Sequence, residues 1–328
     1  MTALAPTVRD TSVRSALLSR AHEHLNIHAQ LPRPGSGRTL HRWQQLAAFG
    51  AEDACLAKLL EAHYDALAIL AELGEPEPPP GELWAVWAAE PPAAKVDLAR
   101  VDSMPILNGT KAWCSGAQWV SHALMTVRQG DRGRLVAVSM DEKGITHDAS
   151  AWQAVGMARI VSGTVHFSDV VSRPIGAPGA YLDRPGFWHG GAGIAACWYG
   201  AASCVAQPLR AAAGRPGGAH AMAHLGRVDT ILCAGAAMLR ELAHRIDHHP
   251  EQAHQRDVTR VRSYMERAAS EVIDRVGRAL GAGPLCLDGA HAQRTADLQV
   301  FIRQSHAEKD WEFLGRALDE REVDPWTL

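Results

Sequence analysis

The sequence predicts an α+β protein with an N-terminal helical domain, a middle domain of short β-strands and a C-terminal bundle of four helices. Near both ends of the chain, apolar residues recur every three or four positions, as in amphipathic helices; in the middle they alternate, as in strands. A stretch rich in proline and glycine, residues 74–81, separates the first helices from the strands. At 328 residues the chain exceeds the size at which a single core keeps growing, so two or three domains are expected.

The N-terminal helical domain is predicted to span residues 1–82. Between about residues 10 and 73 the apolar positions follow helical spacing, for example at Leu56 and Leu60. The segment 32–37, Pro-Arg-Pro-Gly-Ser-Gly, interrupts these helices, because proline lacks a backbone donor and glycine favours turns.

The middle domain, residues 83–182, is predicted to be a small antiparallel β-barrel, since many short strands lie close together in the sequence. The strand candidates are 84–89, 105–107, 111–115, 122–128, 134–140 and 163–167. Asn108-Gly109 predicts a type I′ hairpin turn, because this dipeptide tolerates positive φ at both central positions. The strand after it carries Trp113 and Ser115, a ring and a hydroxyl that suit a planar heterocycle. A tryptophan packed in an ordinary hairpin is the alternative interpretation.

The C-terminal domain, residues 183–328, is predicted to hold four helices that form a bundle. Their expected ranges are 193–213, 224–246, 256–280 and 290–318. The first is apolar nearly all round, which indicates a buried central helix. Gly281-Ala282-Gly283-Pro284 ends the third helix.

The composition is that of a soluble globular protein, with 47% hydrophobic and 21% charged residues. A net charge of -3 provides no electrostatic reason to expect nucleic acid or an anionic membrane as partner. No apolar run approaches the roughly 20 residues that span a bilayer, and no signal peptide is visible at the start. The six cysteines are scattered, which favours buried free thiols in a reducing compartment. We therefore expect a cytoplasmic protein.

Several common site motifs are missing. The sequence contains no Gly-x-Gly-x-x-Gly after a strand, no phosphate-binding P-loop and no Gly-x-Ser-x-Gly elbow. Among 17 histidines, His24/His28 and His244/His248 have the four-residue spacing that brings two rings to one helix face. Neither pair has a third ligand at motif spacing, so we interpret both as surface residues and expect no metal site.

The layout resembles the acyl-CoA dehydrogenase family in four segments that occur in the family's order. Residues 87–91, Trp-Ala-Ala-Glu-Pro, are similar to the family's Cys-Val-Thr-Glu-Pro strand. Residues 107–115, Leu-Asn-Gly-Thr-Lys-Ala-Trp-Cys-Ser, are similar to its Leu-Asn-Gly-x-Lys-x-Trp-Ile-Thr. The segments 156–170 and 275–283 are similar to its Gly-Met-Arg…Val-x-Phe-x-Asp-Val and Gln-x-x-Gly-Gly-x-Gly motifs. The resemblance covers roughly residues 40–318, and the N-terminal helical domain is shorter than the family's.

The resemblance implies FAD as cofactor and a homodimer or homotetramer in which a partner subunit contributes to the flavin site. Trp113 and Ser115 match the positions that cover the flavin ring and bind near its N5. The segment Ala88, Ala89 and Glu90 matches the strand that passes the flavin pyrimidine, although Ala89 lacks the family's threonine hydroxyl. The residues that match the segment meeting the partner's FAD are Arg278, Gly281 and Ala282.

Other positions depart from the family pattern. Where the family has Glu-Pro-Gly-Ala-Gly-Ser-Asp, this chain has Glu-Pro-Pro-Ala-Ala-Lys at 90–95, without Ser-Asp. Pro92 also removes a backbone donor there. The family's Arg-x-Thr-Phe-Gly, which grips the FAD pyrophosphate, is reduced to Arg-Pro-Gly-Gly at 215–218. Only Arg215 remains there to pair with phosphate.

The catalytic base of the family is also replaced. The two positions at which family members carry a glutamate fall on Ser305-His306 and near Gly190-Gly191, and neither holds a carboxylate. His306 is the best substitute as catalytic base, because imidazole titrates near neutral pH. The alternative is that His306 is an exposed helix residue.

Three functions follow from the resemblance. The first is an FAD-dependent oxidoreductase that acts on the CH–CH group of an acyl thioester bound to CoA or to a carrier. The second is a relative that works as a flavin monooxygenase or oxidase. The third is a non-catalytic subunit that keeps the fold in order to dimerise or to bind a partner. Retention of Trp113 and Ser115 favours the first two, and loss of the usual base favours the third.

Overall fold

The computed structural model describes residues 11–130, 132–213, 218–319 and 326. The contacts between residues cluster into two compact units. The first unit holds Met1–Leu31 and Cys55–Phe187, and the second unit holds Pro32–Ala54 and Trp188–Leu328. The predicted division into three domains stays a prediction.

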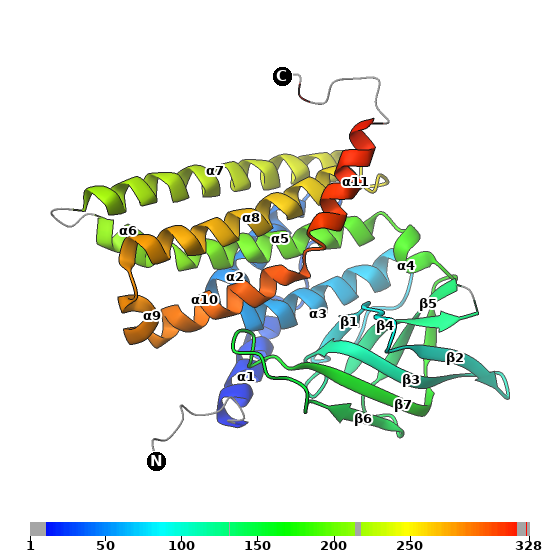
Figure 1. Cartoon of the computed structure of the whole chain (residues 1–328). Coiled ribbons are helices and arrows are strands. Elements are labelled where there is room, and N and C mark those ends of the chain that lie inside the picture. The colour runs from blue at the N-terminus through cyan, green and yellow to red at the C-terminus, as the bar shows by residue number, and fades with distance from the viewer. Residues whose placement is uncertain (1–10, 131, 214–217, 320–325, 327–328) are drawn as a thin grey trace, which may run out of the picture. The chain divides into compact units, whose positions relative to one another are not determined.

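The first unit contains an eight-stranded sheet (Figure 1). Its strands are β1 (Trp84–Trp87), β2 (Val96–Val101), β3 (Met104–Ser115), β4 (His122–Gln129), β5 (Arg132–Ser139), β6 (Ile145–Asp148), β7 (Ser162–Val171) and β8 (Arg173–Ile175). They are ordered β6-β7-β3-β2-β4-β5-β8, with β1 paired to β4. Both β1 and β2 run parallel to β4, so the sheet is mixed rather than antiparallel. No pairing in the described part of the chain joins β6 to β8, and the predicted closed barrel is not confirmed.

The predicted turn at Asn108-Gly109 is wrong. Residues 104–115 form one continuous strand, and the hairpin that joins β2 to β3 turns at Asp102-Ser103 instead. Both residues of that turn have positive φ, 49° and 70°, which a type I′ turn requires. Gly109 serves another purpose, because a Cβ atom there would overlap with the carbonyl oxygen of Lys95. The glycine therefore permits a close approach of two strands.

Helix α3 (Ala54–Glu72) covers the sheet of the first unit through its C-terminal half. Ala66, Ile69 and Leu70 of α3 form one buried cluster with side chains from β1, β4, β5 and β8. Beyond this cluster, the Glu72 carboxylate accepts hydrogen bonds from Arg184 Nη1 (2.8 Å) and from the backbone N–H of Gly186 (2.9 Å). Two further helices, α1 (Thr11–Ile27) and α4 (Ala180–Asp183), complete this unit.

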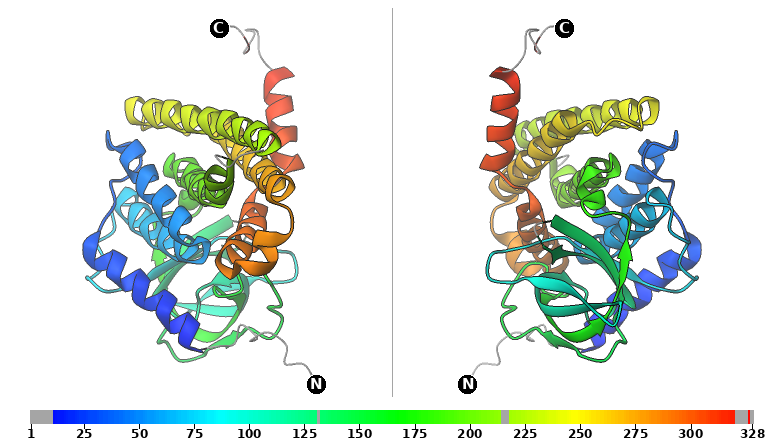
Figure 2. Two further views of the ribbon diagram at one scale, coloured as in Figure 1. Left: turned by 90° about the vertical axis from the view of Figure 1, so that its left-hand side faces the viewer. Right: turned by 90° about the vertical axis from the view of Figure 1, so that its right-hand side faces the viewer.

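The second unit is helical in all its regular elements among the described residues. They are α2 (Thr39–Glu52), α5 (Gly186–Val205, whose first two residues fall in the first unit), α6 (Gln207–Ala213), α7 (Ala219–His248), α8 (Gln255–Leu280), α9 (Gly283–Leu287), α10 (Gly289–Phe301), the 3-10 helix η1 (Ile302–Gln304) and α11 (Glu308–Asp319). The predicted helices 224–246 and 256–280 match α7 and α8, which run side by side (Figure 2). None of these helices, nor any other in the described part of the chain, has the length and apolar composition needed to cross a membrane.

Two predicted helices are interrupted. The helix expected at 193–213 breaks at Ala206, since Pro208 lacks a backbone donor and is tolerated only in the first turn of a helix, here that of α6. The helix expected at 290–318 breaks between Gln304 and Ala307, where the backbone becomes extended and then left-handed. There the guanidinium of Arg262, a distant residue of α8, binds the Gln304 carbonyl (3.1 Å). The spacing of apolar residues along the sequence does not reveal such a long-range contact.

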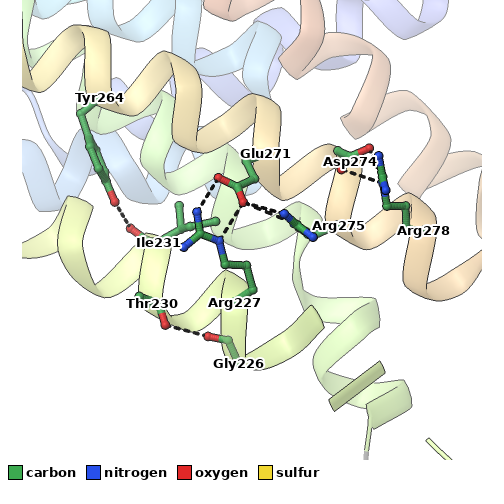
Figure 3. Close-up of polar contacts among 9 residues, drawn as sticks. All are labelled: Gly226, Arg227, Thr230, Ile231, Tyr264, Glu271, Asp274, Arg275 and Arg278. Atoms are coloured by element: carbon green, nitrogen blue, oxygen red, sulfur yellow. Dashed lines mark hydrogen bonds and ion pairs between the residues drawn. The ribbon is translucent and has the colours of Figure 1, made fainter. Parts of the chain in front are cut away.

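Helices α7 and α8 are joined by an ion-pair group on their surface. Figure 3 shows the Glu271 carboxylate of α8 between Arg227 of α7 and Arg275 of α8, at 2.8 and 3.1 Å. The hydrogen bond from Arg227, followed by that from Arg275, lowers the pKa of Glu271 below its usual value. All three side chains are partly exposed, so we expect this group to orient the helices more than to stabilise them.

Candidate functional site

Trp113 stands out on the sheet of the first unit. It lies at a β-bulge, because the two residues of β3 between Lys111 and Cys114 oppose a single residue of β7. Its φ is 61°, a left-handed conformation that costs about 1–3 kcal/mol for a bulky residue. Nevertheless 59% of the residue is exposed, so burial of the ring in this unit does not offset that cost. Strained residues of this kind cluster at functional sites.

Ser115 ends the same strand and is held from two sides. Its hydroxyl lies 2.6 Å from the hydroxyl of Ser162, its register partner on β7. Its carbonyl accepts a hydrogen bond from the indole N–H of buried Trp87 (3.2 Å). The structure thus places the two residues of the predicted pair, Trp113 and Ser115, on one strand with a fixed backbone at Ser115.

The segment Ala88–Glu90 follows β1 and belongs to no strand. Ala88 is half-buried, whereas Ala89 and Glu90 are exposed. The hydroxyl of Thr126, on β4, donates a hydrogen bond to the Ala88 carbonyl (3.3 Å). The sequence predicted a strand here up to residue 89, but β1 ends at Trp87, and the first residue of the segment is anchored to β4. The role of Ala88, Ala89 and Glu90 in binding a flavin stays a prediction.

Beneath this segment lies the buried ammonium of Lys111, which the sequence analysis did not single out. Lys111 is 1% exposed. Its Nζ donates hydrogen bonds to the carbonyl and the hydroxyl of Thr126, at 2.5 and 3.0 Å, and lies 3.7 Å from the Glu90 carboxylate. Burial lowers the pKa of Lys111, and the nearby Glu90 and Cys114 partly counter this effect. The available signal was that Lys111 is the one charged residue of β3.

Cys114 lies between the two expected site residues of β3 and is fully buried. Burial raises the pKa of its thiol to about 12, although Lys111 opposes this shift. The thiol is therefore protonated and unreactive at neutral pH. The expectation of buried cysteines holds for Cys55, Cys114 and Cys197, and it is wrong for Cys233 and Cys286, which are exposed.

The expected adenosine-contacting residues lie at the end of α8 in the second unit. Arg278 is exposed and pairs with Asp274 at 2.9 Å (Figure 3). Gly281 has a φ of 66° and ends the helix, and Ala282 precedes α9. A φ of 66° combined with a ψ of -160° is a conformation that essentially only glycine adopts, which explains the choice of glycine at 281. Arg215, the remaining phosphate-binding candidate, lies outside the described residues.

His306 is not a helix residue, contrary to one interpretation of the sequence. It lies in the connection between η1 and α11, and 71% of its side chain is exposed. Its Nδ1 is 3.4 Å from the Asp310 carboxylate. The other histidine near an expected base position, His189, is buried, and its Nε2 lies 2.8 Å from the Gln252 carbonyl. The role of His306 as a catalytic base stays a prediction.

A separate cavity of about 400 Å³ lies at the opposite end of β1 from Ala88. Trp84 and His122, which are register partners on β1 and β4, stack with their ring centroids 4.7 Å apart in its wall. Glu82 accepts the indole N–H of Trp84 (2.8 Å) and pairs with His122 (3.4 Å). Glu82, Trp84 and His122 of this wall thus pair with one another.

No family model matches the chain, and no curated protein matches it by sequence. Solved structures do match. They include butyryl-CoA dehydrogenase from Megasphaera elsdenii (13% identity, 98% of this chain and 100% of that one, TM-score 0.77). They also include the dibenzothiophene monooxygenase TdsC from Paenibacillus sp. A11-2 with FMN and indole (18% identity, 96% of this chain and 98% of that one, TM-score 0.74). A third is the nitrososynthase from Micromonospora carbonacea var. africana (15% identity, 98% of this chain and 98% of that one, TM-score 0.71). The chain therefore has the fold of the acyl-CoA dehydrogenases and of the monooxygenases related to them.

Proposed function

We propose that this chain is a flavin-dependent oxidoreductase that binds FAD at the Trp113–Ser115 end of β3 and the Ala88–Glu90 segment. The observation that carries the proposal is Trp113, a strained and exposed aromatic residue beside a fixed serine. Flavins occur in structures of this fold: TdsC is in complex with FMN, and glutaryl-CoA dehydrogenase from Mycobacterium smegmatis is in complex with FADH2 (15% identity, TM-score 0.74).

The residues on the first unit fit the flavin in their chemistry. Trp113 offers an aromatic face to a flat ring, and Ser115 offers a hydroxyl that can donate or accept. The exposed residues Ala89 and Glu90 offer backbone amide and carbonyl groups to the polar edge of a heterocycle. In the proposed homodimer or homotetramer, Arg278, Gly281 and Ala282 meet the FAD of a partner subunit.

The proposed reaction oxidises the CH–CH group of an acyl thioester carried by CoA or by a carrier. The bound flavin would supply the acceptor for the hydride. A protein group must then take the proton from the neighbouring carbon, and His306 is the candidate, with Asp310 beside it. His306→Ala would abolish bleaching of the flavin by substrate while FAD stays bound. Unchanged bleaching would remove His306 from the mechanism.

A second candidate is an oxygen-using flavin monooxygenase or oxidase. It is favoured by the absence of a carboxylate at both expected base positions and by the exposure of His306. Solved structures with this fold include a dibenzothiophene monooxygenase and a nitrososynthase. Anaerobic reduction of the flavin by an acyl-CoA would support the first candidate, and oxygen consumption by the reduced flavin would support the second.

The visible absorption spectrum of the purified protein, before and after addition of FAD, tests the proposal. Flavin bands near one equivalent per chain are the expected result, and a parallel titration with FMN shows which flavin is held more tightly. A colourless protein that ignores both flavins would overturn the proposal. It would then favour the third possibility, a non-catalytic subunit that dimerises or binds a partner.

A further inference from the structure

The buried Lys111 ammonium needs an explanation beyond packing. Removing an ammonium from water is costly, and an apolar residue of similar volume is often as good or better for stability. Lys111 is nevertheless 1% exposed within the first unit. Its Nζ donates to the carbonyl and the hydroxyl of Thr126 and lies 3.7 Å from Glu90. The residues that contact the ammonium indicate which part of the structure its charge stabilises.

These contacts all lead to the segment 88–90. The Thr126 hydroxyl, bound by Lys111, donates onward to the Ala88 carbonyl (3.3 Å). The Glu90 carboxylate contacts the same ammonium directly. A single charge therefore links both ends of a three-residue segment that no strand pairing holds. Thr126 is itself fixed in β4 opposite Leu135 of β5, so the link is rigid on one side.

We propose that Lys111 is a positioning residue that fixes the backbone of Ala88–Glu90 in the conformation that receives the flavin. Lys111 does not itself contact the flavin in this account, because it lies beneath the segment and is closed to solvent. The inference rests on the proposed function, since the same segment is the proposed flavin contact. It adds a residue that neither the family resemblance nor the fold comparison assigns to the site.

The test begins with Lys111→Met, which keeps the length and the apolar stem and removes the charge. The variant is expected to fold, because Glu90 is 49% exposed and water can solvate it after the ammonium is lost. Two results are expected: FAD binding weakened by at least about tenfold, and faster amide hydrogen exchange in the peptide that contains residues 88–90. Lys143→Met, which removes an exposed lysine from the same unit, is the matched control and should change neither quantity.

A double-mutant cycle separates positioning from a general loss of stability. Thr126→Val removes the hydroxyl between Lys111 and Ala88 and keeps the side-chain shape. Thr126→Val leaves the contact between Lys111 and Glu90 in place, so Lys111→Met/Thr126→Val should weaken FAD binding about as much as Lys111→Met alone does. Losses that multiply would overturn the inference, as would a Lys111→Met protein with wild-type affinity and wild-type exchange at residues 88–90.

Failure of the proposed function would be distinguishable from failure of this inference. If the wild-type protein binds neither FAD nor FMN, the flavin proposal fails, and exchange at residues 88–90 of the flavin-free protein still decides whether Lys111 orders the segment. Faster exchange in Lys111→Met than in wild type supports positioning, and equal exchange overturns it.

Discussion

Trp113 shows how much the local backbone can reveal about a site. A left-handed tryptophan costs free energy, and an exposed ring recovers little of it within its own unit. The bulge that creates this conformation also interrupts the pairing of β3 with β7, next to Ser115. A planar ligand over the ring would recover part of the cost by burying apolar surface.

Trp113→Gly should distinguish the contribution of the ring to flavin binding from the cost of the strained backbone to stability. Glycine adopts the left-handed conformation freely, so removing the strain of about 1–3 kcal/mol should offset the extra entropy of glycine. We expect thermal stability to be unchanged or higher by about 1 kcal/mol, and FAD binding to be lost. Thermal unfolding and flavin titration measure the two effects. Trp311→Ala, at another exposed tryptophan, is the control and should keep FAD; equal FAD loss in both variants would contradict the assignment.

The cysteines allow a test of burial near the site. Because burial raises the Cys114 pKa to about 12, only about one thiol in ten thousand is ionised at pH 8, and the thiolate is the reactive form. Iodoacetamide at pH 8 should therefore modify exposed Cys233 and Cys286 and spare Cys114. Peptide mapping by mass spectrometry gives the order of reaction, and all six cysteines should react in urea. Modification of Cys114 as fast as Cys233 would show that β3 is open to solvent.

At the scale of the elements, two glycines set the contact between α2 and α5 in the second unit. A Cβ atom at Gly50 would overlap with the Cys197 carbonyl, and one at Gly200 would overlap with the Ala47 carbonyl. Both obstacles are backbone atoms, which cannot rotate away as a side chain can. The two helices can approach this closely only because each presents a glycine to the other.

Gly200→Ala should therefore destabilise the second unit although alanine favours helices. We expect a loss of about 1–3 kcal/mol or more in the free energy of unfolding, because the helices must separate. Gly226→Ala, on α7, is the matched control: nothing lies within 4 Å of its added Cβ, and it should stabilise the protein by about 0.5–1 kcal/mol. Urea denaturation measures both, and a stabilised Gly200→Ala variant would contradict the packing argument.

At the scale of the whole molecule, the proposed FAD site requires more than one copy of the chain. Arg278, Gly281 and Ala282 would contact the flavin of a partner subunit, and two exposed leucines lie close by on α9. These are Leu285 (42% exposed) and Leu287 (89% exposed). Apolar side chains this exposed are consistent with an interface that forms when two copies associate.

Leu287→Asp should then weaken self-association and FAD binding together. The residue is exposed, so we expect the fold to be kept and the dimer to dissociate at higher protein concentration than in wild type. Light scattering during size exclusion measures the mass, and flavin titration at several protein concentrations measures the coupling. Ile27→Asp, at an exposed isoleucine of the first unit, is the control. A monomeric wild-type protein that holds one FAD per chain would contradict the proposal.

Local pattern was enough to predict helices at both ends of the chain with strands between them, the positions of β1, β3, β4, β5 and β7, and those of α7 and α8. The strands β2, β6 and β8 lie where no strand was predicted. The features that were predicted depend on residues close together in the chain, whose apolar spacing reports which side is buried. The pair Trp113 and Ser115 was predicted in the same way, because both residues lie within a single motif, and its role in binding a flavin stays a prediction.

Contacts between distant residues decided the rest. Pairing with β2 and β7 decides whether the chain turns at Asn108-Gly109 or continues as a strand. The contact with Arg262 decides whether residues 302–307 stay helical. The link from Lys111 through Thr126 to Ala88 joins two strands and the segment that follows a third. The spacing of apolar residues shows which side of an element is buried, but not which residue it contacts. These features are therefore determined only when the sheet and the helices assemble.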